Sequence, residues 1–106
     1  MDSLIKVIEI WSPTQESAEL QLTQGGYGDY SELRIESEGL HFAHGVGLPG
    51  RAWSSASPLI LEELENSYFL RSELTRRAGL NSALALPIFS GECLLAVVVL
   101  LCGSPD

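Results

Sequence analysis

The chain has 106 residues and a mass of 11.5 kDa, which is enough for one domain with a modest hydrophobic core. Apolar residues make up 45% of the chain and charged residues 19%, proportions that are typical of a globular protein and not of a disordered one. The net charge of −8 and the pI near 4.6 argue against nucleic acid and anionic membranes as partners, because both bind clustered Lys and Arg.

The apolar runs and the cysteines indicate the compartment. The longest apolar run, Cys93 to Cys102, is about half the length that a bilayer-spanning helix needs, and no secretory signal pattern opens the chain. If this run is one strand, its two cysteines lie about 30 Å apart and cannot form a disulfide with each other. We therefore expect a soluble protein of the reducing cytoplasm.

The N-terminal third predicts a β-hairpin. Leu4–Trp11 is rich in β-branched residues, and Ala18–Thr23 alternates between apolar and polar residues, as a half-buried strand does. The turn-forming cluster Ser12–Ser17 separates them. The glycine-rich segment Gln24–Tyr30 predicts a loop, and Leu33–Ile35 is compatible with a short helix or a short strand.

The middle of the chain predicts short elements. Gly39–Ala43 reads as a short strand, followed by a short helix with Pro49 in its first turn, where the missing N–H costs nothing. Ser54–Pro58 ends that helix, and Pro58–Leu61 predicts another short strand.

The last third predicts a helix and two strands. Asn66 is a candidate N-cap for a helix over Ser67–Ala78, and Gly79 suits its left-handed end. The spacing of three apolar residues at i, i+4 and i+8 predicts a core-facing stripe made of Leu70, Leu74 and Ala78. Two strands follow, with a two-residue turn at Ser90-Gly91 between them; they cover Ser82–Phe89 and Glu92–Leu101.

These elements contain more apolar strand surface than the chain can cover. The first and last strands are apolar on both sides, and the last one does not alternate, so it should be buried on both faces. The predicted helices cover one face of such a sheet only. Large apolar side chains left in water would forgo about 1.5–3 kcal/mol each. We therefore expect either a second copy packed on the other face or missing helices of a longer protein.

Several stretches, in this order and spacing, resemble the GAF domain, a sensor module of bacterial signalling proteins. They run over nearly the whole chain and comprise Ile8–Trp11, Phe42–Trp53, Ser57–Ile60, Phe69–Arg71, Ala78–Pro87 and Gly91–Leu101. The resemblance implies a single α+β domain over residues 1–106, with an antiparallel sheet of five to six strands and one or two short helices on the pocket face. Members of that family cover the opposite face with N- and C-terminal helices, which this sequence is expected to lack.

The resemblance also implies a small-molecule pocket under the short helix and its neighbouring loops. Its candidate residues are Phe42, His44, Arg51, Trp53, Phe69, Arg71 and Ser82. The aromatic residues could form an apolar pocket wall or simply belong to the core, and the arginines could clamp an anion or pair with acidic residues. No cofactor and no catalytic residue is expected.

Other motifs carry less chemistry. Gly45–Gly50 formally matches the dinucleotide fingerprint, but Pro58 stops the following helix too early for a βαβ unit. His41 and His44 would point to opposite faces of a strand, so no metal site is expected. Cys93 and Cys102 are better interpreted as small buried apolar residues than as a redox pair.

These observations lead to three hypotheses. The first is a non-catalytic sensory or regulatory module that binds a small ligand, forms a homodimer through its sheet face, or does both, with a signalling protein as a further possible partner. The second is a small redox enzyme of the free methionine sulfoxide reductase type, which is one branch of the GAF family. The third is a vestigial dimerisation module whose pocket is filled by side chains.

Overall fold

The computed structural model describes residues 4–14, 18–64, 67–69 and 71–103. Within them one six-stranded sheet has the order β3-β2-β1-β6-β5-β4, and every neighbouring pair is antiparallel. The strands are β1 (Leu4–Pro13), β2 (Leu20–Gly26), β3 (His41–Phe42), β4 (Leu59–Leu61), β5 (Leu80–Ser90) and β6 (Cys93–Gly103). The helices are α1 (Ser31–Glu38), α2 (Gly47–Ser55) and α3 (Ser72–Arg77).

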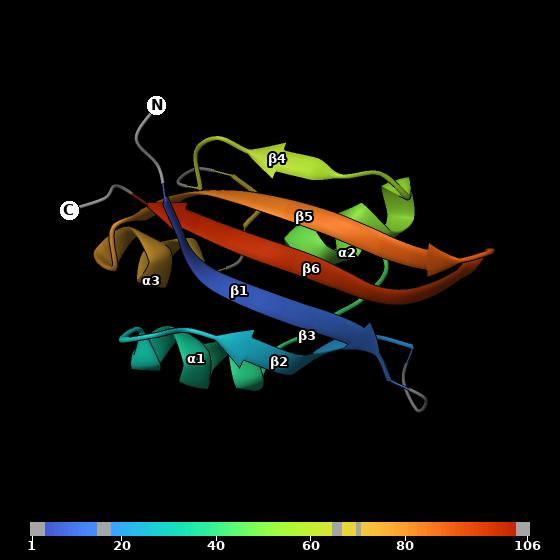
Figure 1. The fold of residues 1–106 in the computed structure, drawn as a ribbon, viewed down its shortest axis with the longest axis horizontal. Coiled ribbons are helices and arrows are strands. Elements are labelled where there is room, and N and C mark those ends of the chain that lie inside the picture. The colour runs from blue at the N-terminus through green and yellow to red at the C-terminus, as the bar shows by residue number, and fades with distance from the viewer. Residues whose placement is uncertain (1–3, 15–17, 65–66, 70, 104–106) are drawn as a thin grey trace.

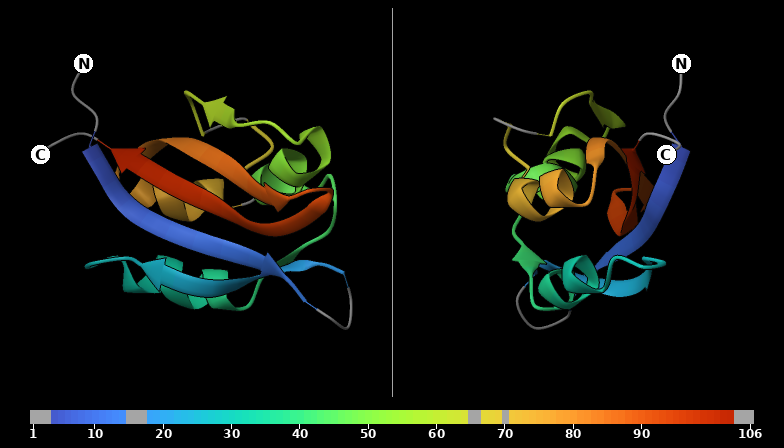
Figure 2. Two further views of the ribbon diagram at one scale, coloured as in Figure 1. Left: turned by 45° about the vertical axis from the view of Figure 1, so that its right-hand side comes forward. Right: turned by 90° about the vertical axis from the view of Figure 1, so that its left-hand side faces the viewer.

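All three helices lie on one side of the curled sheet, which we call the inner face. Figure 1 looks onto the opposite side, the outer face, and Figure 2 shows the helices gathered behind the strands. The fold class is the expected one, an α+β domain built on an antiparallel sheet. The structure adds one helix, α1, where the sequence left the choice between helix and strand open.

The N-terminal hairpin is confirmed, but its second strand runs further than expected. The segment Gln24–Gly26 was predicted as a loop, and this was wrong: it continues β2 and pairs with Ile8–Ile10. Backbone pairing to a neighbouring strand needs no side chain, so tertiary context overrides the low strand propensity of glycine here.

The helix predicted over Ser67–Ala78 is shorter, because α3 begins at Ser72. The Ser67 hydroxyl donates to the Leu64 carbonyl at 2.6 Å and accepts from the Phe69 N–H at 3.1 Å, and this local turn competes with helix formation. Leu74 and Ala78 pack against the core as expected, and Gly79 ends the helix at φ +79°. Asn66 and Leu70 lie outside the described residues.

The final hairpin forms, with its turn one residue later than predicted. Ser90 pairs with Cys93, so the two loop residues are Gly91 and Glu92 and not Ser90 and Gly91. Gly91 has φ +61° at the first loop position, where tight hairpins require positive φ. A register shift between Ile88 and Phe89 brings Ser90 opposite Cys93, which shortens the loop to Gly91 and Glu92.

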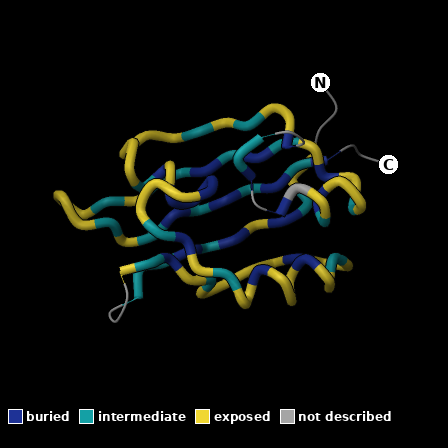
Figure 3. The backbone as a smooth tube through the Cα atoms, turned by 180° about the vertical axis from the view of Figure 1, so that it is seen from behind, coloured by how far each residue is buried: buried dark blue, intermediate teal, exposed yellow. Residues whose placement is uncertain are grey.

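The two faces of the sheet differ in how well the chain covers them. On β6, Val97, Val99 and Leu101 are fully buried under the helices, whereas the alternate residues are partly exposed on the outer face. Figure 3 shows this alternation along the central strands. The expectation that β6 is buried on both faces is therefore met on the inner face only, because the described helices all lie on that side.

Apolar side chains cross the outer face in two rows. Cross-strand pairing aligns the members of the rows, which are Ile8, Leu100, Leu84 and Ile60 in one and Ile10, Val98 and Leu86 in the other. Ile8 is 48% exposed and Ile60 69% exposed. The described helices include none that is long and apolar enough to cross a membrane.

Candidate functional site

A buried ion pair lies between the sheet and the helices. Glu9 lies two residues from Val7 and from Trp11 on β1, so it shares their buried face of the strand. Its carboxylate therefore points toward the inner face of the sheet. Arg71 directly precedes α3 and reaches the same point from the opposite side. The side chains of Glu9 and Arg71 are 0% and 1% exposed, so this pair is removed from water.

Four donor atoms converge on the Glu9 carboxylate. Oε1 accepts from Trp11 Nε1 at 2.9 Å and from Arg71 Nη2 at 3.1 Å. Oε2 accepts from Arg71 Nη1 at 2.5 Å and from the Tyr27 hydroxyl. The arginine therefore binds the carboxylate in the bidentate, fork-like geometry that is the strongest for this pair.

The guanidinium of Arg71 has further neighbours. Nη1 also donates to the Ser37 hydroxyl of α1 at 2.6 Å. The Phe69 ring centre lies 4.9 Å from the guanidinium carbon, within the range of a cation–π contact, and the Trp11 ring centre lies 5.3 Å away. Among the described residues, Arg71 Nε is a buried donor that has no hydrogen-bond acceptor.

The surroundings of Tyr27 keep its hydroxyl protonated. Burial raises the pKa of this phenol far above its usual value, and the neighbouring Glu9 carboxylate raises it further. Tyr27 is thus a permanent hydrogen-bond donor at neutral pH. The cluster holds one negative and one positive charge that pair with each other. Neutral donors also contact the carboxylate, and the Ser37 hydroxyl and aromatic rings also contact the guanidinium.

Three of the candidate residues predicted from the sequence meet at this cluster. They are Phe42, Phe69 and Arg71, all buried. The Phe42 ring packs edge-on against the Trp11 ring, with centroids 4.8 Å apart. Of the two alternatives for Arg71, the structure places it in an ion pair with an acidic residue.

The other four candidates lie elsewhere. His44 and Trp53 contact each other, with ring centroids 5.0 Å apart, near α2. Arg51 is exposed on α2 and stacks over the Tyr68 ring at 3.8 Å. Ser82 pairs with Cys102 across the β5–β6 ladder, away from the ion pair. The structure therefore does not bring the seven predicted residues into one group.

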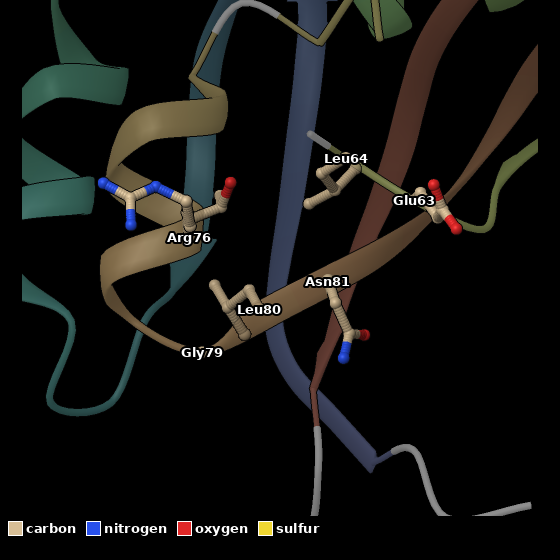
Figure 4. A pocket seen from close by; sticks show the side chains of 7 residues that line it. Glu63, Leu64, Arg76, Gly79, Leu80 and Asn81 are labelled. Carbon is tan, nitrogen blue, oxygen red and sulfur yellow. The ribbon is translucent and has the colours of Figure 1, made fainter. Parts of the chain in front are cut away.

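Surface cavities occur at the edges of the fold. One of about 380 Å³ opens between α3 and the start of β5, with Leu64 and Leu80 at its centre and Arg76 directed away from them (Figure 4). A second, of about 660 Å³, is lined by Ile60, Ser82 and Cys102 among others. Neither includes a residue of the ion-pair cluster.

The histidines and cysteines do not assemble into a site. His41 lies 3.6 Å from Glu19, whereas His44 packs on Trp53, and the described residues contain no cluster of three or more metal-ligating side chains. Cys93 and Cys102 are both free and lie near opposite ends of β6. Their interpretation as small buried residues is wrong, because Cys93 is exposed and Cys102 is half-buried. The expectation that they cannot bridge each other agrees with this arrangement.

A family model matches most of this chain. The model of the GAF domain matches residues 10–106. The chain belongs to the GAF domain family. A comparison with curated protein sequences found no match.

Solved structures agree with this GAF fold at low sequence identity. The GAF domain of A. aeolicus nlh2 in an inactive state has a TM-score of 0.71 at 21% identity, over 96% of this chain and 60% of that one. The free methionine-R-sulfoxide reductase of Neisseria meningitidis has a TM-score of 0.69 at 15% identity, over 92% of this chain and 52% of that one. A mutated NreA protein of Staphylococcus aureus has a TM-score of 0.67 at 11% identity, over 92% of this chain and 73% of that one. The chain thus spans less than two thirds of the first two structures.

Sequence patterns in this GAF domain did not identify Glu9 and Ser37, which Arg71 contacts, or Trp11 and Tyr27, which donate to the Glu9 carboxylate. One signal was available: Glu9 occupies the same strand face as Val7 and Trp11, and an acidic residue at such a position requires a buried partner. Ser37 and Tyr27 carry no such signal, since polar residues on a short helix and after a glycine-rich strand are ordinary surface residues.

Proposed function

We propose that this GAF domain is a non-catalytic sensory or regulatory module that works by forming a homodimer through its outer sheet face. The observation that carries the proposal is the apolar surface on that face, in particular the two cross-strand rows that contain Ile8 and Ile10. An exposed apolar patch of this kind on a soluble domain marks an interaction site.

Charge and shape support a second copy as the occupant. The two rows contain no charged side chain, although the chain as a whole carries a net charge of −8. Two copies that meet through the two rows therefore bury no charged row residue, and one apolar patch can be self-complementary about a two-fold axis. A hollow of about 480 Å³ beside Ile8 and Ile10, next to Gly25 and Gly26, offers space for a partner side chain.

The interior favours association over an open ligand pocket. The donors that an anionic ligand would need, from Arg71, Trp11 and Tyr27, are already directed to Glu9. The Glu9 side chain thus takes the place that an anionic ligand would occupy between the sheet and the helices, which supports a role in dimerisation. A different signalling protein seated on the outer face is the alternative occupant.

The resemblance to methionine sulfoxide reductases motivates a second candidate, a redox enzyme. The arrangement of the two cysteines does not favour it, because Cys93 and Cys102 end the same strand and neither contacts the buried cluster. Replacing both by serine discriminates between the candidates in an assay of free methionine sulfoxide reduction. The regulatory proposal expects no activity in either chain, whereas reduction that is lost in the double variant would establish the enzyme.

A matched pair of substitutions tests the dimer. Ile8 and Ile35 are both exposed isoleucines, at 48% and 64%, but Ile8 lies on the outer face and Ile35 on α1. We expect Ile8→Glu to convert the dimer to a monomer, because it places two carboxylates at the contact. Ile35→Glu should leave the dimer intact. Equal effects of the two changes on the mass in solution, measured by light scattering, would contradict the proposal.

A further inference from the structure

The Glu9–Arg71 cluster has the composition of a carboxylate receptor. Four donor atoms from three residues, Trp11, Tyr27 and Arg71, converge on one planar anion, and they come from β1, the residue after β2 and the residue before α3. Their donors are fixed by burial, since Trp11 is 0% and Tyr27 4% exposed. The bidentate arginine fork fits a carboxylate in particular.

We propose that Glu9 is a tethered ligand of this receptor, so that the folded domain is permanently in its carboxylate-bound state. The ligand class that the receptor takes is a small planar monocarboxylate, and the chain supplies it from its own β1. This inference is independent of the homodimer, because it concerns the inner face and its test does not depend on association.

Three features of the cluster distinguish a receptor from an incidental ion pair. The donors exhaust the good acceptor positions of both carboxylate oxygens, and only one of the contacts, from Trp11, is local in sequence. The guanidinium is held by other groups besides Glu9, namely Ser37 and the Phe69 ring. Arg71 also keeps one buried donor, Nε, that Glu9 does not use. Removing the Glu9 side chain therefore leaves the donor set supported by its other contacts.

The substitution Glu9→Ala creates the empty receptor. It deletes the CH₂–COO⁻ part of the side chain, which corresponds to one acetate ion, and it leaves the buried Arg71 charge without its counter-ion. We expect the variant to be destabilised in chloride buffer and to be stabilised again by sodium acetate at neutral pH. Acetate at about ten times its dissociation constant should raise the folding equilibrium constant about tenfold.

The test is a urea unfolding series in acetate and in chloride at equal ionic strength. Three controls accompany Glu9→Ala: the wild-type chain, whose receptor is occupied, the isosteric Glu9→Gln, whose side chain fills the space, and the double variant Glu9→Ala/Arg71→Met, which lacks the main donor. None of the three should distinguish acetate from chloride. In Glu9→Ala the indole N–H resonance of Trp11 should also shift with acetate in NMR spectra.

Each outcome decides the proposal. If Glu9→Ala is unfolded in chloride, the same titration is followed as refolding by circular dichroism. A second variant, Glu9→Ser, leaves a smaller space that is matched to formate and is tested with that ion. A response of either variant to its carboxylate, absent from the controls, supports the tethered ligand. The proposal is overturned if neither variant responds, or if the wild type or the Arg71→Met double variant responds equally.

Discussion

Removing one partner of the buried ion pair should cost a large part of the stability of the domain. Arg71→Met leaves the Glu9 carboxylate buried with only the donors of Trp11 and Tyr27, because the substitution deletes three hydrogen bonds of the guanidinium, two to Glu9 and one to Ser37. Breaking such a buried pair typically costs about 3–5 kcal/mol. Domains of this size are stable by about 5–15 kcal/mol in total.

Removing both charges should cost less than removing one. The double variant Glu9→Gln/Arg71→Met keeps an oxygen acceptor for Trp11 and Tyr27 and leaves no buried charge. We expect it to regain at least about 2 kcal/mol relative to Arg71→Met, which is a coupling energy within the range found for residues in direct contact. The free energy that is regained measures the penalty of the unpaired carboxylate.

The assay is urea unfolding followed by tryptophan fluorescence, at one fixed protein concentration so that association contributes equally to all variants. Arg77→Met is the matched control, because Arg77 forms a surface ion pair with Glu32 at 3.5 Å in which both side chains are more than half exposed. It should change the stability by less than about 1 kcal/mol. Equal losses for Arg71→Met and Arg77→Met would refute the reasoning.

Three further predictions concern single residues. Burial and the Glu9 carboxylate raise the pKa of Tyr27 in the folded state, so its contribution to the free energy of unfolding is complete below the unfolded pKa of about 10 and falls by about 1.4 kcal/mol per pH unit above it. Urea midpoints measured from about pH 8 to about pH 11, on both sides of the unfolded pKa, should fall more steeply for the wild type than for Tyr27→Phe. Parallel profiles would exclude this role. Gly50→Ala should destabilise the fold, because its Cβ would lie 2.2 Å from the Ala43 carbonyl oxygen, whereas Gly39→Ala meets nothing closer than 3.8 Å and should be nearly neutral in thermal unfolding. Ala56→Gly should raise the stability by about 1 kcal/mol, since Ala56 ends α2 at φ +55°, a conformation that glycine adopts at lower cost; a loss of stability would contradict this.

Patterns along the chain predicted the sheet and its shortage of cover, because strand alternation and apolar runs depend on local sequence. Leu4–Trp11 and the run from Cys93 to Cys102 became β1 and β6, the two neighbouring central strands. The ends of helices and strands were less predictable where a neighbouring segment offers the backbone other hydrogen bonds. The Ser67 side chain turns back to Leu64 and delays α3, and pairing with β1 extends β2 over two glycines.

The buried Glu9–Arg71 cluster was harder to predict from the sequence, because it depends on contacts between residues that are far apart along the chain. Arg71 was a candidate, but its partner Glu9 is 62 positions away. The spacing of charged residues along a chain does not indicate which acidic residue an arginine will meet. The inward register of Glu9 on β1 was the one local sign that it needs a buried cation.

The mass of the wild-type protein in solution tests the central claim most directly, namely that a second copy covers the outer sheet face. Sedimentation equilibrium at micromolar concentration should give a particle of twice the 11.5 kDa chain mass. A particle of 11.5 kDa under the same conditions, with Ile8, Ile10 and their row neighbours left in water, would contradict the account.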